Sequence, residues 1–187
     1  MASERIRQQW NLAFPDTVPV GAICRDLYLH RWVRVHSLPE SKRYAETEPG
    51  RREVLRRYNR FGSHVLGEGE PCVLFVSKPQ LGNGEAGVAG KNPFFAEDLI
   101  PVSTMAHAEQ EFTVEARESI WHTGGWDTVL SEVADDKAPF VLFFSAARSA
   151  IFAPYDGGAD AIFSTAAQAD AARELFRSWL SSRTDGY

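Results

Sequence analysis

The stretch Trp32-Val33-Arg34-Val35-His36-Ser37-Leu38-Pro39-Glu40-Ser41-Lys42-Arg43-Tyr44 combines a strand pattern, a proline and a compact cationic corner. Val33 and Val35 alternate with more polar neighbours, which predicts a strand over residues 30–37 with one buried face. The opposite face of this strand carries Trp32, Arg34 and His36. Pro39 ends the strand, because proline has no backbone N–H to give to a sheet.

A basic helix is expected directly after this stretch. Thr47 is a suitable N-cap, and Pro49 falls in the first turn, where its missing N–H costs nothing. Gly67 and Gly69 mark its end. The buried stripe of this helix consists of Val54, Leu55, Tyr58, Phe61 and Val65. A spacing of i, i+4 aligns three basic side chains on its outer face, namely Arg52, Arg56 and Arg60.

The remaining segments predict an α+β fold. The continuous apolar runs 72–76 and 140–144 are typical of central strands. Further strands are expected at 112–117, 150–153 and 161–163, and further helices at 3–14, 126–133 and 165–180. Residues 15–28 look like an irregular connector, and 93–108 show no clear pattern. Short connections between the later strands favour a mostly antiparallel sheet of about five or six strands, packed with about four helices.

The length and composition indicate a single globular domain over residues 1–187, with a flexible glycine-rich loop at 79–92. The net charge is −5, but residues 1–64 carry +5 and residues 65–187 carry −10. The basic first third and the acidic remainder are either complementary to each other, or the first forms a basic face suited to an acidic partner.

The cysteines and the absence of targeting segments favour a cytoplasmic protein without a membrane segment. Cys24 and Cys72 are far apart and lack metal-ligand spacing. A disulfide between them stays open, but two thiols in a reducing compartment are the expected state. The N-terminus lacks an apolar secretory core, and no apolar run approaches the roughly 20 residues that span a bilayer.

Standard catalytic and cofactor motifs do not fit the chain. Residues 82–87 read Gly-Asn-Gly-Glu-Ala-Gly, but Gly90 and Pro93 follow in place of the helix that a dinucleotide site needs. The five histidines lack metal-ligand spacing, and the chain has no G-x-S-x-G elbow. We therefore expect no cofactor, no metal and no catalytic residue, which favours a protein that is not an enzyme.

Two groups of residues remain as candidate binding sites. Asp156 and Asp160 flank Gly157-Gly158, where they either bind a ligand or simply build a hairpin turn. Arg34 and Arg43 either bind an anion or pair with acidic residues of the C-terminal half. The first candidate group is Arg34, His36, Ser41, Lys42, Arg43, Tyr44, Arg52, Arg56 and Arg60. The second is Tyr155, Asp156 and Asp160.

Several motifs resemble a known group of proteins. The first is Arg34-x-His36-Ser37-Leu38-Pro39-Glu40-Ser41-Lys42-Arg43-Tyr44, followed by Arg57-Tyr58-Asn59. Two more are Ala153-Pro154-Tyr155-Asp156-Gly157-Gly158-Ala159-Asp160 and Trp179-Leu180-Ser181. Together they resemble bacterial conserved hypothetical proteins of unknown function, and the ending is similar to that of small immunity-type proteins. The resemblance implies a bacterial cytoplasmic protein and transfers no catalytic residue.

Two functions from different classes remain. The leading hypothesis is a non-enzymatic protein-recognition domain, immunity-like or regulatory, that binds an acidic protein through its basic surface. The alternative is a small enzyme or binding module for a phosphate or carboxylate, with Arg34, Lys42 and Arg43 as clamp and His36 as proton carrier. The alternative gains if Arg34, His36, Arg43 and Asp156 converge in one concave pocket. Nucleic-acid binding is disfavoured by the acidic remainder of the chain.

Overall fold

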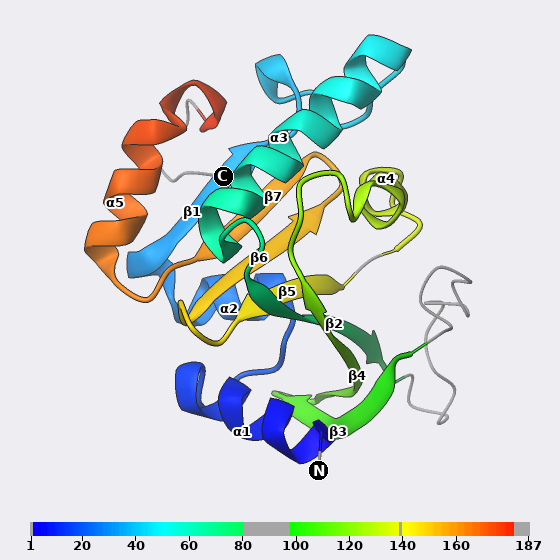
Figure 1. Ribbon diagram of the computed structural model, residues 1–187, viewed down its shortest axis with the longest axis vertical. Helices are drawn as coiled ribbons and strands as arrows, with labels where there is room; N and C mark the ends of the chain where they lie inside the picture. The colour runs from blue at the N-terminus through cyan, green and yellow to red at the C-terminus, as the bar shows by residue number, and fades with distance from the viewer. Residues whose placement is uncertain (1, 81–97, 139, 182–187) are drawn as a thin grey trace.

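A seven-stranded antiparallel sheet forms the centre of the computed structural model, which describes residues 2–80, 98–138 and 140–181 (Figure 1). Its strand order is β1-β7-β6-β5-β2-β4-β3. The strands are β1 (Trp32–His36), β2 (Pro71–Pro79), β3 (Ile100–His107), β4 (Gln110–Ile120), β5 (Val141–Ser145), β6 (Ala150–Tyr155) and β7 (Gly158–Ile162). The α-helices are α1 (Ala2–Ala13), α2 (Gly21–Leu27), α3 (Glu48–Leu66), α4 (Asp127–Ala134) and α5 (Ala166–Leu175). Short 3-10 turns are η1 (Leu29–Arg31), η2 (Pro39–Ser41) and η4 (Arg177–Trp179).

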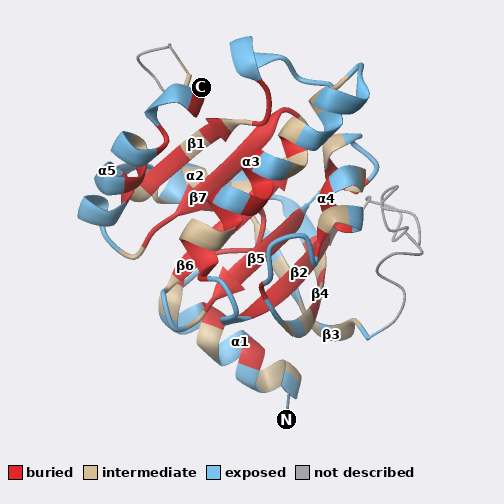
Figure 2. Ribbon diagram, turned by 45° about the horizontal axis from the view of Figure 1, so that its top comes forward, coloured by how far each residue is buried: buried red, intermediate tan, exposed pale blue. Residues whose placement is uncertain are grey.

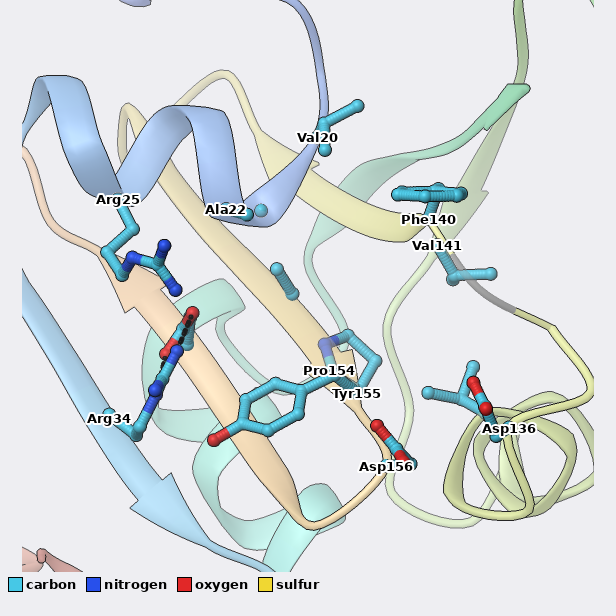
Figure 3. Close-up of a pocket in the computed structure, with 14 residues that line it drawn as sticks. Val20, Ala22, Arg25, Arg34, Asp136, Phe140, Val141, Pro154, Tyr155 and Asp156 are labelled. Atoms are coloured by element: carbon cyan, nitrogen blue, oxygen red, sulfur yellow. Dashed lines mark hydrogen bonds and ion pairs between the residues drawn. The ribbon is translucent and has the colours of Figure 1, made fainter. Parts of the chain in front are cut away.

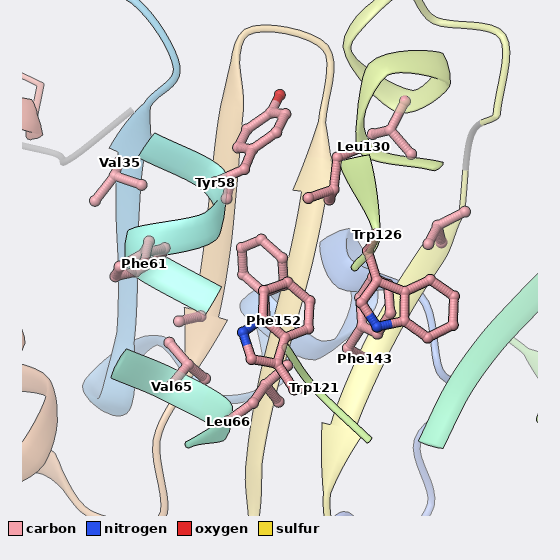
Figure 4. Close-up of a cluster of buried hydrophobic side chains, with 14 of the residues drawn as sticks. Val35, Tyr58, Phe61, Val65, Leu66, Trp121, Trp126, Leu130, Phe143 and Phe152 are labelled. Atoms are coloured by element: carbon pink, nitrogen blue, oxygen red, sulfur yellow. The ribbon is translucent and has the colours of Figure 1, made fainter. Parts of the chain in front are cut away.

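The sheet lies between two layers of helices, and each layer has its own hydrophobic core (Figure 2). Helices α3, α4 and α5 cover one face, where Phe61, Trp121 and Phe152 are fully buried (Figure 4). Helices α1 and α2 lie against the other face, where Trp10 and Phe144 are fully buried. Strands β2, β5 and β6 contribute side chains to both cores, which explains their continuous apolar sequences.

The predicted α+β class and antiparallel pairing are confirmed. The runs 72–76 and 140–144 belong to β2 and β5, which are neighbours within the sheet. Helix α3 begins after Thr47, whose hydroxyl accepts a hydrogen bond from the Gly50 N–H at 3.3 Å. Helix α5 follows Thr165, whose hydroxyl accepts from the Gln168 N–H at 3.2 Å.

The predicted numbers of strands and helices were too small. Helix α2 lies inside the segment 15–28 that was expected to be irregular; its seven residues bury only Cys24, too few to show a helical stripe. Strand β3 occupies residues 100–107 of the ambiguous segment 93–108. It is an edge strand whose register shifts between Pro101 and Ser103, so its sequence does not alternate regularly.

Two residues, Leu175 and Pro79, differ from the sequence predictions, and most of the predicted glycine-rich loop falls on residues that the structure does not describe. The last helix was expected over residues 165–180, but α5 ends at Leu175, which is 54% exposed. Pro79, the first residue of the predicted glycine-rich loop, belongs to β2. Most of that loop, within 81–97, lies outside the described residues. No helix among the described residues is long and apolar enough to cross a membrane.

Candidate functional site

Strand register brings the two candidate groups of residues together. Strand β1 pairs with β7 so that Arg34 lies opposite Asp160. Strand β7 pairs with β6 so that Asp160 lies opposite Ala153 and Gly158 lies opposite Tyr155. Because successive side chains of a strand alternate between faces, Arg34, Asp160 and Tyr155 all lie on the face that α2 covers. Residues more than a hundred positions apart thus form one cluster.

Arg34 and Asp160 form the most buried ion pair among the described residues. The guanidinium donates two hydrogen bonds to the carboxylate, from Nε at 2.8 Å and from Nη2 at 3.0 Å. Only 13% of the Arg34 side chain and 6% of the Asp160 side chain are exposed. The guanidinium also stacks between the rings of Trp32, at 5.2 Å, and Tyr155, at 4.9 Å. These contacts hold the Arg34 side chain in place, and its positive charge is paired with the Asp160 carboxylate.

A second polar group joins the cationic corner to the β6–β7 turn. The Asp156 carboxylate accepts hydrogen bonds from Arg43 Nε at 2.5 Å and from the Tyr44 hydroxyl at 2.8 Å. These hydrogen bonds raise the pKa of both donors. Gly157 has a φ of +103°, and a Cβ there would lie 3.2 Å from Arg43 Cγ, so the turn requires glycine. Asp156 therefore both builds the hairpin and anchors the corner.

A cleft of about 280 Å³ lies between the first turn of α2, strands β1, β6 and β7, and the segment from α4 to β5 (Figure 3). Helix α2 packs closely against β6 there, and only glycine fits at position 21. A Cβ on Gly21 would lie 2.7 Å from the Cβ of Ala153. The apolar walls of the cleft include Val20, Ala22, Phe140, Val141, Ala153 and Pro154. Its polar lining consists of Arg25, Arg34, Tyr155, Asp136, Asp156 and Asp160.

Charge is unevenly distributed along the cleft. Figure 3 shows Arg25 and Arg34 on one side and Asp136 and Asp156 on the other. Arg34 is paired with Asp160, and Arg25 forms an ion pair with Asp26 at 2.8 Å. Asp136, in contrast, has no side-chain hydrogen bond or ion pair with any residue that the structure describes, although its charge contributes to raising the pKa of Arg43. The acidic end of the cleft therefore carries a carboxylate available to a ligand.

The rim at this acidic end has an unusual backbone. Asp136 has a φ of +57° and Phe140 has a φ of +61°, and a bulky residue rarely adopts such a value. The Phe140 ring packs edge-on against Phe112, 6.4 Å between centroids, yet remains 38% exposed. Left-handed conformations of residues other than glycine are often found at binding sites, where the surrounding structure compensates for their cost. Here both of these residues line the cleft.

The other predicted site residues do not converge on the cleft. His36 lies on the face of β1 that also carries Arg34, but it does not line the cleft. Burial and the charges of Arg34 and Arg57 lower the pKa of His36, so its imidazole is neutral near pH 7. Ser41 is exposed at the end of η2, and Lys42 contacts Glu40 at 3.6 Å. Of the predicted clamp and proton carrier, only Arg34 therefore lines the cleft.

The arginine face of α3 is largely compensated by acidic neighbours. Arg52 contacts Glu48 at 3.5 Å, and Arg56 pairs with Glu53 at 2.6 Å. Arg60 is exposed and stacks over Trp179, 5.6 Å from the ring centroid, without an ion pair among the described residues. The net positive charge of this helix face is therefore smaller than its three arginines alone suggest.

Several lining residues escaped the sequence interpretation because they belong to no periodic pattern. Val20 precedes a short helix, and Asp136 follows α4 in a charged turn. Phe140 was assigned to a central strand, but β5 begins one residue later and leaves its ring at the surface. Their common signal is position in loops that flank buried strands, where binding residues often occur.

Both cysteines are buried thiols. Burial raises the pKa of Cys24 to about 12, and burial likewise raises the pKa of Cys72 to about 12. Both cysteines are free and would be protonated near neutral pH. No group of three or more potential metal-ligating side chains occurs within the described ranges.

Comparison with known proteins gives one match. A family model described as a domain of unknown function (DUF3885) matches residues 20–184, which includes every residue of the cleft. No curated protein and no solved structure matches the chain.

Proposed function

The chain belongs to the DUF3885 family, and we propose that it is a non-enzymatic recognition domain whose cleft binds a basic side chain of a protein partner. The observation that carries this proposal is the acidic end of the cleft, where the Asp136 carboxylate lies in the same lining as the exposed Phe140 ring. A carboxylate attracts an ammonium or guanidinium group, and an aromatic face attracts the same cation.

The size and walls of the cleft fit a long side chain better than a larger molecule. Its volume of about 280 Å³ lies at the lower limit of small-molecule sites, which span roughly 300–1,000 Å³. Val141, Ala153 and Pro154 offer an apolar surface on which the aliphatic stem of lysine or arginine can lie. The cationic head would then reach Asp136.

The lining favours binding over catalysis. Among the described residues, the cleft contains no serine, threonine, cysteine, histidine or lysine side chain. Asp160 and Asp156 already accept charged hydrogen bonds from Arg34 and Arg43. A nucleophile next to a base, the usual signature of covalent catalysis, is therefore not present in this lining.

Nuclear magnetic resonance titration with N-acetyl-lysinamide and N-acetyl-argininamide tests the proposal. We expect saturable shifts in the amide signals of α2, β6 and the turn after α4, with N-acetyl-norleucinamide as the uncharged control. Asp136→Asn should weaken binding about tenfold, because it removes one charge-assisted contact. Asp135→Asn is the matched control, since Asp135 pairs with Arg51 and Lys137 and does not line the cleft. Equal binding by D136N and the wild-type protein would contradict the proposal.

A second recognition mode, for an acidic protein surface, has one specific observation in its favour. Arg56, Arg57 and Arg60 all stack around Trp179, at 5.3, 5.1 and 5.6 Å from its ring centroid. Arg60 is the member of this trio without an ion pair in the described part of the chain. Binding of a polyglutamate peptide should weaken as salt rises and should weaken further in Arg60→Gln. Salt-independent binding, or none, would exclude this mode.

A further inference from the structure

A second cavity lies on the opposite side of the sheet from α2. It has a volume of about 360 Å³ and lies between the end of α3, the β5–β6 turn and the first turns of α5. Four polar side chains line it: His64, Arg148, Ser164 and Gln168. The rest of the lining is apolar, including the ring of Phe163, and none of the lining residues is acidic.

Three hydrogen-bond donors of this cavity have no partner among the described residues. Gln168 Oε1 accepts from the Ser164 hydroxyl at 2.5 Å, which leaves the Gln168 amide NH₂ without a partner. The His64 ring packs edge-on against Phe163 and Phe176, but neither of its nitrogens forms a hydrogen bond within the described residues. Arg148 forms no ion pair there either.

The local charge at this cavity is positive. Burial lowers the pKa of His64, and the nearby charge of Arg148 lowers it further, so the His64 imidazole is neutral near pH 7 and the basic group of this cavity is the Arg148 guanidinium. Glu70 is the acidic residue that could compete with a bound anion for Arg148. Its Cγ and the Arg148 guanidinium both lie against Gly67. Glu70 does not line the cavity and forms no ion pair with Arg148.

We propose that this cavity binds an oxyanion carried on a small apolar or aromatic body. Arg148 pairs with the oxyanion, and the His64 N–H and the Gln168 amide complete its hydrogen bonds. Phe163 and the apolar wall contact the body of the ligand. This site is independent of the α2 cleft, since the two share no lining residue.

Isothermal titration calorimetry with benzoate and phenyl phosphate tests the site. We expect saturable binding of at least one of these anions to the full chain, with a dissociation constant of about 1 mM or lower. The two probes separate a carboxylate from a phosphate ester, and benzyl alcohol is the uncharged control. Arg148→Gln should weaken binding about tenfold. Glu70→Gln is the matched control and should leave binding unchanged or tighten it, because it removes only the competitor.

Two outcomes would overturn the site. The first is a wild-type protein that binds neither anion at about 10 mM, ten times the expected dissociation constant. The second is an R148Q protein that binds as tightly as the wild-type protein. If Arg148 only stabilises the carboxyl end of α3 through its charge, R148Q would lower the unfolding temperature while the wild-type protein shows no anion binding.

Discussion

At the scale of single residues, the ion pair between Arg34 and Asp160 should be the most sensitive contact of the sheet. Both charges are buried, so removing one leaves the other uncompensated. We expect Asp160→Asn to lower the free energy of unfolding by about 3 kcal/mol. Urea denaturation followed by circular dichroism measures this change.

A double variant distinguishes the pair's own contribution from the cost of an orphaned charge. Arg34→Met combined with Asp160→Val removes both charges and keeps apolar volume on both strands. It should cost less than Asp160→Asn alone, because no buried charge remains. A change below about 1 kcal/mol for D160N would mean that solvent compensates Arg34 and that the pair is not buried in solution.

Glu53 provides a prediction for the pH dependence of stability. Hydrogen bonds from Arg56 and from Arg57 lower its pKa to about 2 in the folded protein. Because this pKa lies below the unfolded value of about 4.3, the stabilisation is complete above about pH 4.3 and is lost as the pH falls toward 2. We expect Glu53→Gln to cost about 1–2 kcal/mol at pH 7, since Glu53 is one quarter exposed.

Measuring the unfolding free energy of the wild-type protein and of E53Q across pH separates the contribution of Glu53 from that of the other carboxylates. The difference in unfolding free energy between wild type and E53Q should be constant from pH 7 to about pH 5 and should narrow below about pH 4.3. A difference that stays constant down to pH 3 would show that the folded-state pKa of Glu53 is not lowered.

At the scale of elements, α3 depends on a glycine in its interior. Gly62 is buried against Trp121, and a Cβ there would lie 2.3 Å from the Cζ2 atom of that ring. Alanine has the better helix propensity by about 1 kcal/mol, but overpacking a rigid core costs roughly 1–3 kcal/mol. The 2.3 Å approach places the packing cost near the upper end of this range, so we expect Gly62→Ala to lower stability by a net of about 1–2 kcal/mol, as measured by thermal and urea unfolding.

Gly50, in the first turn of the same helix, is the matched control for this substitution. Its closest neighbour would be the Ala45 Cβ at 3.3 Å, in a partly exposed loop that can adjust. Gly50→Ala should therefore change stability by less than about 0.5 kcal/mol. Equal effects at the two glycines would show that propensity, rather than the contact with Trp121, determines the outcome.

The same elements show what the sequence could reveal. The α3 stripe follows a helical period and the segments of β2 and β5 are continuously apolar. Both patterns identified buried elements, although Phe140 at the start of the second run lies at the surface. Helix α2 has too few residues to show a helical repeat of apolar side chains. Strand β3 is an edge strand with a register shift, so its apolar residues do not alternate regularly. Neither element could therefore be identified from the sequence. Strong local periods thus identify an element, whereas short or irregular elements depend on tertiary contacts that the sequence does not display.

The cleft was harder to predict than the core, because it depends on strand register. The sequence suggested that Arg34 and Arg43 pair with acidic residues of the C-terminal half, and the structure shows Asp160 and Asp156 in these positions. It could not show that Asp136 and Phe140 come from a loop beside the same strands. Spatial neighbours 100 residues apart leave no periodic pattern in one sequence.

At the scale of the whole molecule, the uneven charge of the chain is partly explained by contacts between its two parts. Ion pairs of Arg5 with Glu118, Arg34 with Asp160, Arg43 with Asp156 and Arg51 with Asp135 join the basic first 64 residues to the acidic remainder. These contacts support the interpretation that the basic first third and the acidic remainder complement each other. A basic surface for an acidic partner is correspondingly smaller than the sequence alone suggests.

The two cores should unfold together, because the central strands belong to both. Trp10 and Trp32 lie in the core under α1 and α2, whereas Trp121, Trp126 and Trp179 lie in the core under α3, α4 and α5. Loss of either helical layer would expose the apolar side chains of β2, β5 and β6 on that face, which destabilises the sheet shared with the other layer. The whole chain should therefore behave as one cooperative unit, although α1 lies outside the residues that the family model matches.

Fluorine labelling of the five tryptophans measures this cooperativity for both cores in one sample. With 5-fluorotryptophan, each side chain gives its own fluorine resonance, which Trp→Phe substitutions assign. We expect all five resonances to lose their native intensity at the same urea concentration, in agreement with circular dichroism. If the Trp10 resonance is lost well before that of Trp121, the layer formed by α1 and α2 unfolds separately. The α2 cleft would then be bordered by a mobile layer, and its ligand should stabilise Trp10 more than Trp121 against urea.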